Sequence, residues 1–215
     1  RDNLHLSISI RSFRSEKVAK YISNLLEGNI SETKNLLGEL KDSYPIKITR
    51  SLTKAKHWLR KHARGSERYG LLTSSGASRL KPLGIFSGSI TKDNVANWFL
   101  KEDIDVRSSL ALEDAATEFQ VQGLELDWAG LIWDGDLIKT STDWLYKSFV
   151  GTKWNNIMDQ EAQKNKLNAY RVLLTRARQG MIIVVPEGDQ LDKTRDSEKY
   201  DPTWNYLKEI GIDVI

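Results

Sequence analysis

The chain has no cysteine, only three histidines and no apolar run long enough to cross a membrane. Without cysteine it can form neither a disulfide nor a thiolate metal site, which permits a cytoplasmic setting. A spanning helix needs roughly 20 successive apolar residues, and no signal peptide opens the sequence, so we expect a soluble protein with no membrane partner. His5, His57 and His62 are too scattered for a zinc site.

The chain has only a small net excess of positive charge overall, but one region has a large local excess. Lysine and arginine number 32 against 29 for aspartate and glutamate, a formal net charge of +3. Between residues 41 and 81, however, many lysines and arginines stand against only Asp42 and Glu67. Clustered cations bind the phosphate backbone of nucleic acids, whereas the same residues on the outer face of a helix are usually just solvated. We favour contact with nucleic acid, and DNA over RNA.

Apolar runs typical of strands alternate with helical patterns along the whole length. This alternation predicts one three-layer α/β domain over residues 1–215 with a mostly parallel sheet. The expected strands are 4–10, 44–50, 69–74, 129–133 and 181–185, with an edge strand within 212–215. Helices are expected before Gly28, over 53–64, 95–100, 154–167 and 204–210, and ending at Thr175. Residues 136–153 are expected to form an irregular loop and 189–199 a mobile surface loop.

Two stretches carry most of the functional signal. In the first, Thr117 and the pair Gln122-Gly123 precede a buried strand, and a glycine there lets backbone amides approach a ligand closely. In the second, Arg176 and Arg178 follow a helix and lead into another strand. Arginines beside a strand end suit phosphate, because the guanidinium fork matches phosphate oxygens.

Both stretches resemble motifs of a known class. Thr117, followed after four residues by Gln-Gly-Leu-Glu (122–125), resembles the fifth motif of superfamily 1 helicases, and residues 174–178 resemble the sixth. The longer pattern, which adds residues 98–100 and 105–109, resembles a bacterial family of helicase-like ATPases related to the Schlafen helicase-like region and known only as a domain of unknown function. The resemblance implies a RecA-like domain of the P-loop NTPase type, the second (C-terminal) domain of a helicase pair. Arg176 would then be the arginine finger on the terminal phosphate, and the nucleotide would contact Gly123, Glu125 (near the ribose) and Arg178.

The resemblance implies further contacts. Arg11 follows the first expected strand and matches the arginine of the fourth motif, which reaches the terminal phosphate; a solvated arginine at a strand end explains it equally well. The loops after residue 10, after Ser74 and around Gln122-Gly123 are expected together at the carboxyl ends of strands. An N-cap followed by a surface arginine is the structural alternative for the Ser74 region. The residues expected at the nucleic-acid backbone are Ser74, Ser75, Arg79, Thr117 and Gln122.

The sequence lacks the motif that binds nucleotide tightly. The P-loop pattern G-x-x-x-x-G-K-[ST] is absent, because Gly65 and Gly70 have the spacing but Leu71-Leu72 follow. We therefore expect ATP with Mg²⁺ to be held mainly by a preceding P-loop domain of the same parent chain. The sequence starts with Arg1 rather than methionine, so we expect a fragment of a longer DNA-dependent helicase or translocase. A restriction or repair system is one setting for such a parent.

Other functions stay open at this point. Phe119 and Gln120 stand where the fifth motif usually has histidine and lysine, so a simple ATPase switch is an alternative to a helicase. A metal-dependent nuclease is a second alternative, because evenly spaced carboxylates near one strand can hold Mg²⁺. A non-catalytic nucleic-acid or protein docking module is a third. The residues of the nuclease alternative are Glu125, Asp127, Asp134 and Asp136, with Lys139 beside them.

Overall fold

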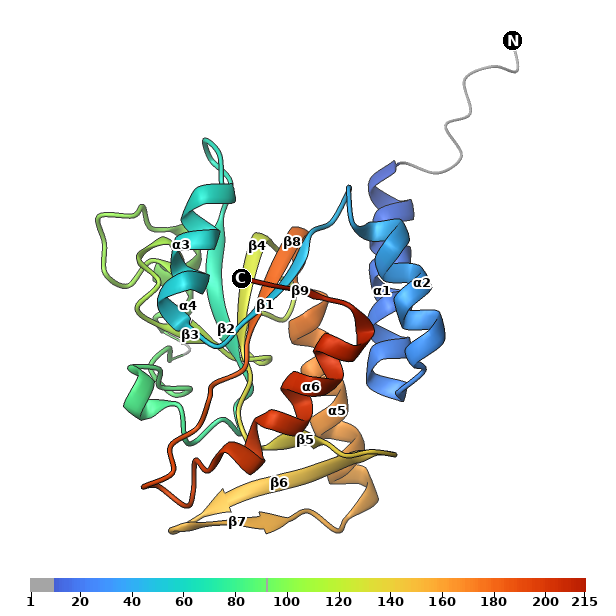
Figure 1. Cartoon of the computed structure of the whole chain (residues 1–215). Coiled ribbons are helices and arrows are strands. Elements are labelled where there is room, and N and C mark those ends of the chain that lie inside the picture. Colours follow the sequence, from blue (N-terminus) through green and yellow to red (C-terminus); the bar gives the residue numbers. More distant parts are fainter. Residues whose placement is uncertain (1–9, 92) are drawn as a thin grey trace.

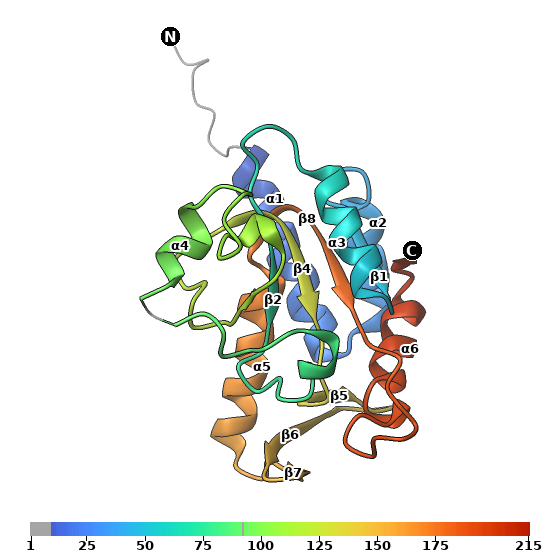
Figure 2. The ribbon, with the colours of Figure 1, turned by 90° about the vertical axis from the view of Figure 1, so that its left-hand side faces the viewer.

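The computed structural model describes residues 10–91 and 93–215, without the side chains of residues 10–13. Its middle layer is a six-stranded sheet in the order β3-β2-β4-β8-β1-β9, in which every neighbouring pair is parallel (Figures 1 and 2). The expected three-layer α/β architecture with a mostly parallel sheet is confirmed. The strands are β1 (Ile46–Thr49), β2 (Tyr69–Thr73), β3 (Ala115–Ala116), β4 (Leu126–Ile132), β8 (Ala177–Val184) and β9 (Asp213–Val214).

Helices lie on both sides of this sheet (Figure 1). On one side are α1 (Ile10–Glu27), α2 (Ile30–Leu40), α5 (Gln160–Leu174) and α6 (Asp201–Ile210). On the other side is α3 (Leu52–His62), whose N-cap Ser51 accepts a hydrogen bond from the Lys54 amide. The short α4 (Val95–Leu100) lies beside the β2–β3 edge (Figure 2). Single 3₁₀ turns occur at Lys81–Leu83, Ser109–Ala111 and Ser197–Lys199.

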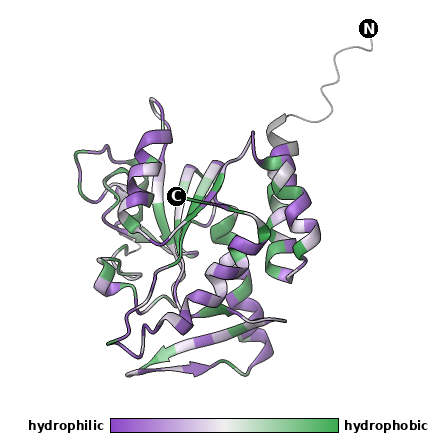
Figure 3. Ribbon diagram, in the orientation of Figure 1, coloured by the Kyte–Doolittle hydropathy of each residue, from purple (hydrophilic) through white to green (hydrophobic). Residues whose placement is uncertain are grey.

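The central strand β8 is apolar on both faces because each face meets a helical layer. Met181 and Ile183 belong to the core cluster shared with α1, α2, α5 and α6, whereas Ile182 and Val184 belong to the cluster shared with α3. This alternation follows from the two-residue repeat of a strand. In Figure 3 the strands of the main sheet are mainly hydrophobic, whereas α3 is largely hydrophilic.

Gly180 allows β1 and β8 to approach closely. A Cβ atom at this position would lie 2.7 Å from the Pro45 carbonyl oxygen and 2.7 Å from a ring carbon of Trp128. The Met181 amide donates to the same Pro45 carbonyl at 3.0 Å. A larger residue at 180 would therefore push the two strands apart.

Residues 137–156 form a second, antiparallel sheet of three strands below the main one in Figure 1, so the irregular loop expected over 136–153 is wrong. Its strands are β5 (Leu137–Lys139), β6 (Trp144–Val150) and β7 (Lys153–Asn156). The helix expected from residue 154 is likewise wrong at its start: α5 begins at Gln160, after N-cap Asp159 accepts from the Ala162 amide at 2.8 Å.

Other boundaries differ less. The expected strand over 4–10 lies outside the described residues except for Ile10, which opens α1. Helix α2 was not expected, and β8 begins at Ala177 rather than at residue 181. The edge strand expected near the end is confirmed as β9. Within the described residues, no helix is both long and apolar enough to cross a bilayer.

Candidate functional site

A shift of register between β4 and β8 brings polar side chains together where these strands begin. Leu126 pairs with Ala177, but Trp128 pairs with Gly180, so Arg178 and Gln179 both lie opposite Asp127. Arg178 Nη2 donates to Asp127 Oδ1 at 2.6 Å, and Gln179 Nε2 donates to the same oxygen at 3.3 Å. Such a bulge re-aims side chains at a sheet end. Here it holds Arg178 against a carboxylate that is itself nearly buried.

Next to this bulge is a cavity of about 300 Å³. Arg178 and Glu125 line it from the β8 and β4 side, with 3.9 Å between Arg178 Nε and Glu125 Oε2. Arg14 and Ser15 line it from α1. The Tyr44 hydroxyl, which donates to the Ala177 carbonyl at 3.1 Å, lies in its buried wall, and burial raises the pKa of Tyr44. The cavity thus offers two arginines and one carboxylate.

Arg176 lies just behind the cavity, between α5 and the loop that precedes β4. Its Nε donates to the Val172 carbonyl, and its Nη1 donates to the carbonyls of Val121 and Leu124, each at 3.2 Å. Its own carbonyl accepts from the Leu126 amide at 3.0 Å. Among the described residues, no partner accepts from its Nη2 group. Arg176 therefore fixes the loop and keeps one amino group available.

Two further residues were expected to contact the nucleotide, Gly123 and Arg11, and only Gly123 is placed near Arg176 by its neighbours Val121 and Leu124. Gly123 adopts a φ of 77°, a left-handed conformation that favours glycine, in the exposed turn before Glu125. Arg11 lies in the first turn of α1, one turn before Ser15 in the cavity wall. The fold therefore gathers Gly123, Glu125, Arg176 and Arg178 in one region, at the amino ends of β4 and β8, and the role of Arg11 stays a prediction.

Of the expected nucleic-acid residues, all except Gln122 follow the carboxyl ends of β2 and β3. Ser74 Oγ donates to Asp136 Oδ2 at 2.6 Å, and Ser75 Oγ donates to Glu118 Oε1 at 2.5 Å. Thr117 Oγ1 donates to Gln120 Oε1 at 2.8 Å. Each of these hydroxyls thus has an acceptor inside the protein. Their contact with nucleic acid stays a prediction.

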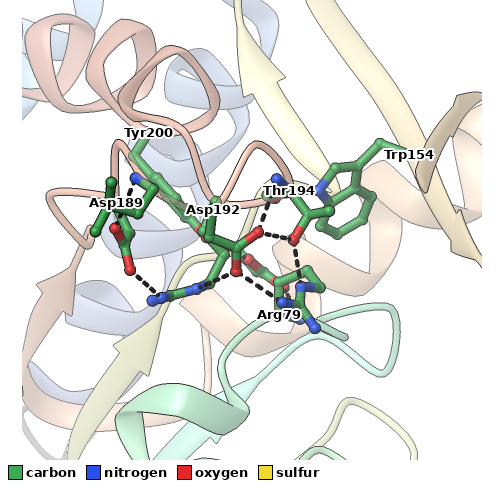
Figure 4. A network of polar contacts seen from close by, with 9 residues as sticks. Arg79, Trp154, Asp189, Asp192, Thr194 and Tyr200 are labelled. Atoms are coloured by element: carbon green, nitrogen blue, oxygen red, sulfur yellow. Dashed lines mark hydrogen bonds and ion pairs between the residues drawn. The ribbon is translucent and has the colours of Figure 1, made fainter. Parts of the chain in front are cut away.

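Arg79 is tied to the loop before α6 (Figure 4). Its Nε donates to Thr194 Oγ1 at 2.7 Å and its Nη2 donates to Asp192 Oδ2 at 2.8 Å. Asp192 also accepts from Arg195, and these bonds hold the pKa of Asp192 well below its usual range, with the Thr194 hydroxyl the largest cause. The loop over 189–199, expected to be mobile, is thus hydrogen-bonded to the carboxyl end of β2.

Two carboxylates after β4 hold this carboxyl edge together. Asp134 accepts from the Arg79 amide at 2.8 Å and from the Tyr200 hydroxyl at 3.0 Å. Burial, followed by repulsion from Asp136, raises the pKa of Asp134 to about 6. Asp136 is fully buried and accepts from Lys166 Nζ at 2.8 Å and from the Tyr170 hydroxyl at 2.6 Å. These contacts make both aspartates part of the support of the Ser74 loop.

The single site expected at the carboxyl ends of the strands is therefore wrong for the Gln122-Gly123 turn. The chain leaves the carboxyl end of β3 at Thr117 and returns to the amino end of β4 at Leu126. β4 has seven residues, so the two ends are about 20 Å apart. Gln122 is exposed near the amino ends, away from Ser74 and Arg79. The site residues thus form two groups. The amino-edge group consists of Arg14, Gly123, Glu125, Arg176 and Arg178, and the carboxyl-edge group consists of Ser74, Ser75, Arg79 and Thr117.

The same separation removes geometric support from the nuclease alternative. Glu125 and Asp127 lie at the start of β4, whereas Asp134 and Asp136 follow its end. In the part of the chain that the structure describes, no three His, Cys, Asp or Glu side chains converge as metal ligands. Lys139 is in the second sheet, with its amine bonded to backbone carbonyls.

Sequence reasoning missed some residues of the site. Arg14 was not assigned a role, although its spacing of three from Arg11 and four from Val18 is that of one helix face. Asp127 was considered only as a metal ligand, because its pairing with Arg178 depends on the register of β4 and β8. No sequence signal fixes that register.

The parallel sheet and the two helical layers are those of a RecA-like α/β domain. The model of the family Schlafen group 3, DNA/RNA helicase domain, matches residues 1–187, and the chain belongs to this family. No curated protein and no solved structure matches the chain. Membership supports a helicase-like role related to nucleic acid.

Proposed function

We propose that this chain is the second motor domain of an ATP-dependent DNA helicase or translocase. The observation that carries the proposal is the amino-edge cavity, where Arg14, Arg178 and Glu125 converge beside Arg176. Two arginines around an open cavity suit the phosphates of a nucleotide, and a carboxylate suits ribose hydroxyls. ATP with Mg²⁺ is a substrate that a P-loop domain elsewhere in the same protein holds against this edge.

In this proposal Arg176 is the arginine finger. Its Nε and Nη1 are fixed by three carbonyls, so the guanidinium is positioned before substrate arrives. The Nη2 group then donates to the terminal phosphate as negative charge develops there. A fixed cation of this kind is worth roughly 10³- to 10⁵-fold in rate. Nucleic acid binds elsewhere, along the carboxyl-edge group and the basic residues between 41 and 81.

The test is ATP hydrolysis by the protein that contains both domains, with and without single-stranded DNA. Arg176→Ala is expected to lower DNA-stimulated turnover at least a thousandfold while nucleotide binding is retained. Arg176→Lys keeps the charge but loses the fork, so we expect a partial loss. Arg171→Ala is the matched control and should leave turnover unchanged. Arg171 lies in the last turn of α5 and donates a hydrogen bond to Asn168.

Unchanged turnover in Arg176→Ala would refute the finger role and favour the docking-module alternative. Loss of nucleotide binding together with turnover, accompanied by a lower melting temperature, would assign Arg176 only to the fixing of the 121–124 loop. Circular dichroism on each variant separates these results.

A further inference from the structure

A second cavity, of about 590 Å³, lies between the small sheet and α6. It shares no lining residue with the amino-edge cavity. Its size is that of a pocket for a small organic ligand. Three lysines line it from different elements: Lys139 from β5, Lys147 from β6 and Lys199 from the 3₁₀ turn before α6.

Lys139 is a buried cation fixed in place. Its residue is 5% exposed, and Nζ donates to the carbonyls of Thr140 at 3.0 Å and Asp143 at 3.3 Å. The ammonium group also lies over the rings of Trp144 and Tyr206, at 5.7 and 5.0 Å from their centroids. An ammonium group has three donors, and two are used here. The third is available to a ligand.

Lys147 and Lys199 add positive charge to the lining of the cavity. Both are half-buried, and neither forms an ion pair with a described residue. Burial and the nearby Lys199 lower the pKa of Lys147. The carboxylates that line the cavity, Glu198 and Glu209, are both exposed. The carboxylates of Asp143 and Glu209 stabilise the charge of Lys139, but Lys147 and Lys199 repel each other. An anion bound between these two lysines relieves the repulsion.

The rest of the lining is suited to an organic group. Ile138, Leu145 and the Tyr206 ring supply apolar surface, and Asn205 supplies a polar amide. We propose that this cavity binds a nucleotide unit, with its phosphate on the three lysines and its sugar and base on the apolar surface. The nucleotide unit is either a free nucleoside monophosphate or one residue of a single strand. This site is independent of the motor function proposed above.

The experiment is isothermal titration calorimetry of the whole chain with adenosine 5′-monophosphate, with adenosine, and with tetrathymidylate carrying a 5′-phosphate. We expect the monophosphate to bind at least tenfold more tightly than adenosine. The double variant Lys147→Gln/Lys199→Gln should raise the Kd for the monophosphate at least tenfold. The control Lys153→Gln/Lys164→Gln removes the same charge from exposed positions outside the cavity and should leave the Kd unchanged.

The ligand arms separate the two sources of the phosphate. Tighter binding of the oligonucleotide, with the same sensitivity to Lys147 and Lys199, assigns a single strand; binding of the monophosphate alone assigns a free nucleotide. No binding of either ligand to the wild-type chain overturns the proposal. Binding that survives the double variant but is lost in Arg178→Ala also overturns it, because the ligand then occupies the amino-edge cavity.

Discussion

The guanidinium of Arg178 lies 2.6 Å from the carboxylate of Asp127, across the one shift of register between β4 and β8. Asp127 Oδ2 also accepts from the Arg68 amide at 2.8 Å, so the carboxylate is anchored from both sides. Arg178 is therefore aimed at the amino-edge cavity by a residue that does not line it. Asp127 is a positioning residue.

Asp127→Asn should weaken nucleotide binding without abolishing turnover. The amide retains one acceptor but loses the charge that holds Arg178, whose side chain is 38% exposed and thus partly screened by solvent. We expect the KM for ATP to rise about three- to tenfold, the range that one charge-assisted hydrogen bond gives when discounted for exposure, with little change in kcat. Steady-state kinetics of the two-domain protein measures both.

A double-mutant cycle checks that Asp127 acts through Arg178. If it does, Asp127→Asn adds little to Arg178→Ala, because both changes remove the same interaction. Fully additive losses would contradict the positioning role and would assign Asp127 to the general stability of the β4–β8 ladder.

Gly180→Ala should destabilise the fold, whereas Gly38→Ala should not. The new methyl group at 180 would lie 2.7 Å from the Pro45 carbonyl oxygen, but at Gly38, inside α2, nothing lies within 4 Å. We expect a loss of about 1–3 kcal/mol in the free energy of unfolding at 180. At 38 we expect a gain of up to about 1 kcal/mol, because alanine favours a helix. Urea denaturation measures both; equal effects would contradict the close approach of β1 and β8.

Asp134 should give stability a dependence on pH that Asp134→Asn lacks. The folded pKa is about 6, above the value near 3.9 of an unfolded aspartate, so the folded state binds more protons between these values. The contribution of Asp134 to the free energy of unfolding therefore falls as pH rises from about 4 to about 6. Above that range the ionised, buried carboxylate lowers the free energy of unfolding by at most about 3 kcal/mol. Denaturation of both proteins from about pH 4 to about pH 8 measures the difference. A difference that is constant with pH would contradict this assignment.

Arg79→Ala should release the loop before α6. The variant loses the bonds to Thr194 and Asp192 shown in Figure 4. We expect faster amide hydrogen exchange at Thr194 and Arg195, whose amides donate within this loop. Arg64→Ala removes an exposed arginine without a side-chain hydrogen bond to any described residue and is the control. Unchanged exchange in Arg79→Ala would mean that the Asp192 turn holds its shape alone.

The layers of the fold were predictable because β1, β2, β4 and the second half of β8 are short apolar runs, whereas the two-residue β3 was not expected. The second sheet was also within reach of sequence, since the run from Trp144 to Val150 is rich in aromatic and β-branched residues. Gly151-Thr152 then forms a two-residue connection to β7, with a φ of 63° at Gly151. Lys147 and Ser148, which stand between these aromatics, concealed the pattern. Helix α2 was overlooked, although Leu36 and Leu40 have helical spacing.

The sequence grouped part of the candidate site, but it did not predict the geometry of that site. The motif spacing grouped Glu125 with Arg176 and Arg178, and the fold places them at one edge. It also suggested that Gln122 and Ser74 share an edge, which the structure contradicts. The direction in which a loop crosses a sheet depends on strand register, and β3 pairs with β2 at Leu71 and Leu72, far along that strand. Contacts of this kind are long-range and leave no local pattern.

The position of β8 between β4 and β1 also governs the order in which the chain can assemble. Ile46 of β1 pairs with Met181, and the other neighbour of β1 is β9, which is later still. During synthesis β1 thus stays unpaired for on the order of ten seconds, at usual elongation rates, until its first partner strand has been made. Pairing of strands that are so far apart in the sequence is slow to nucleate. Refolding from denaturant should therefore be limited by the pairing of β1 with β8.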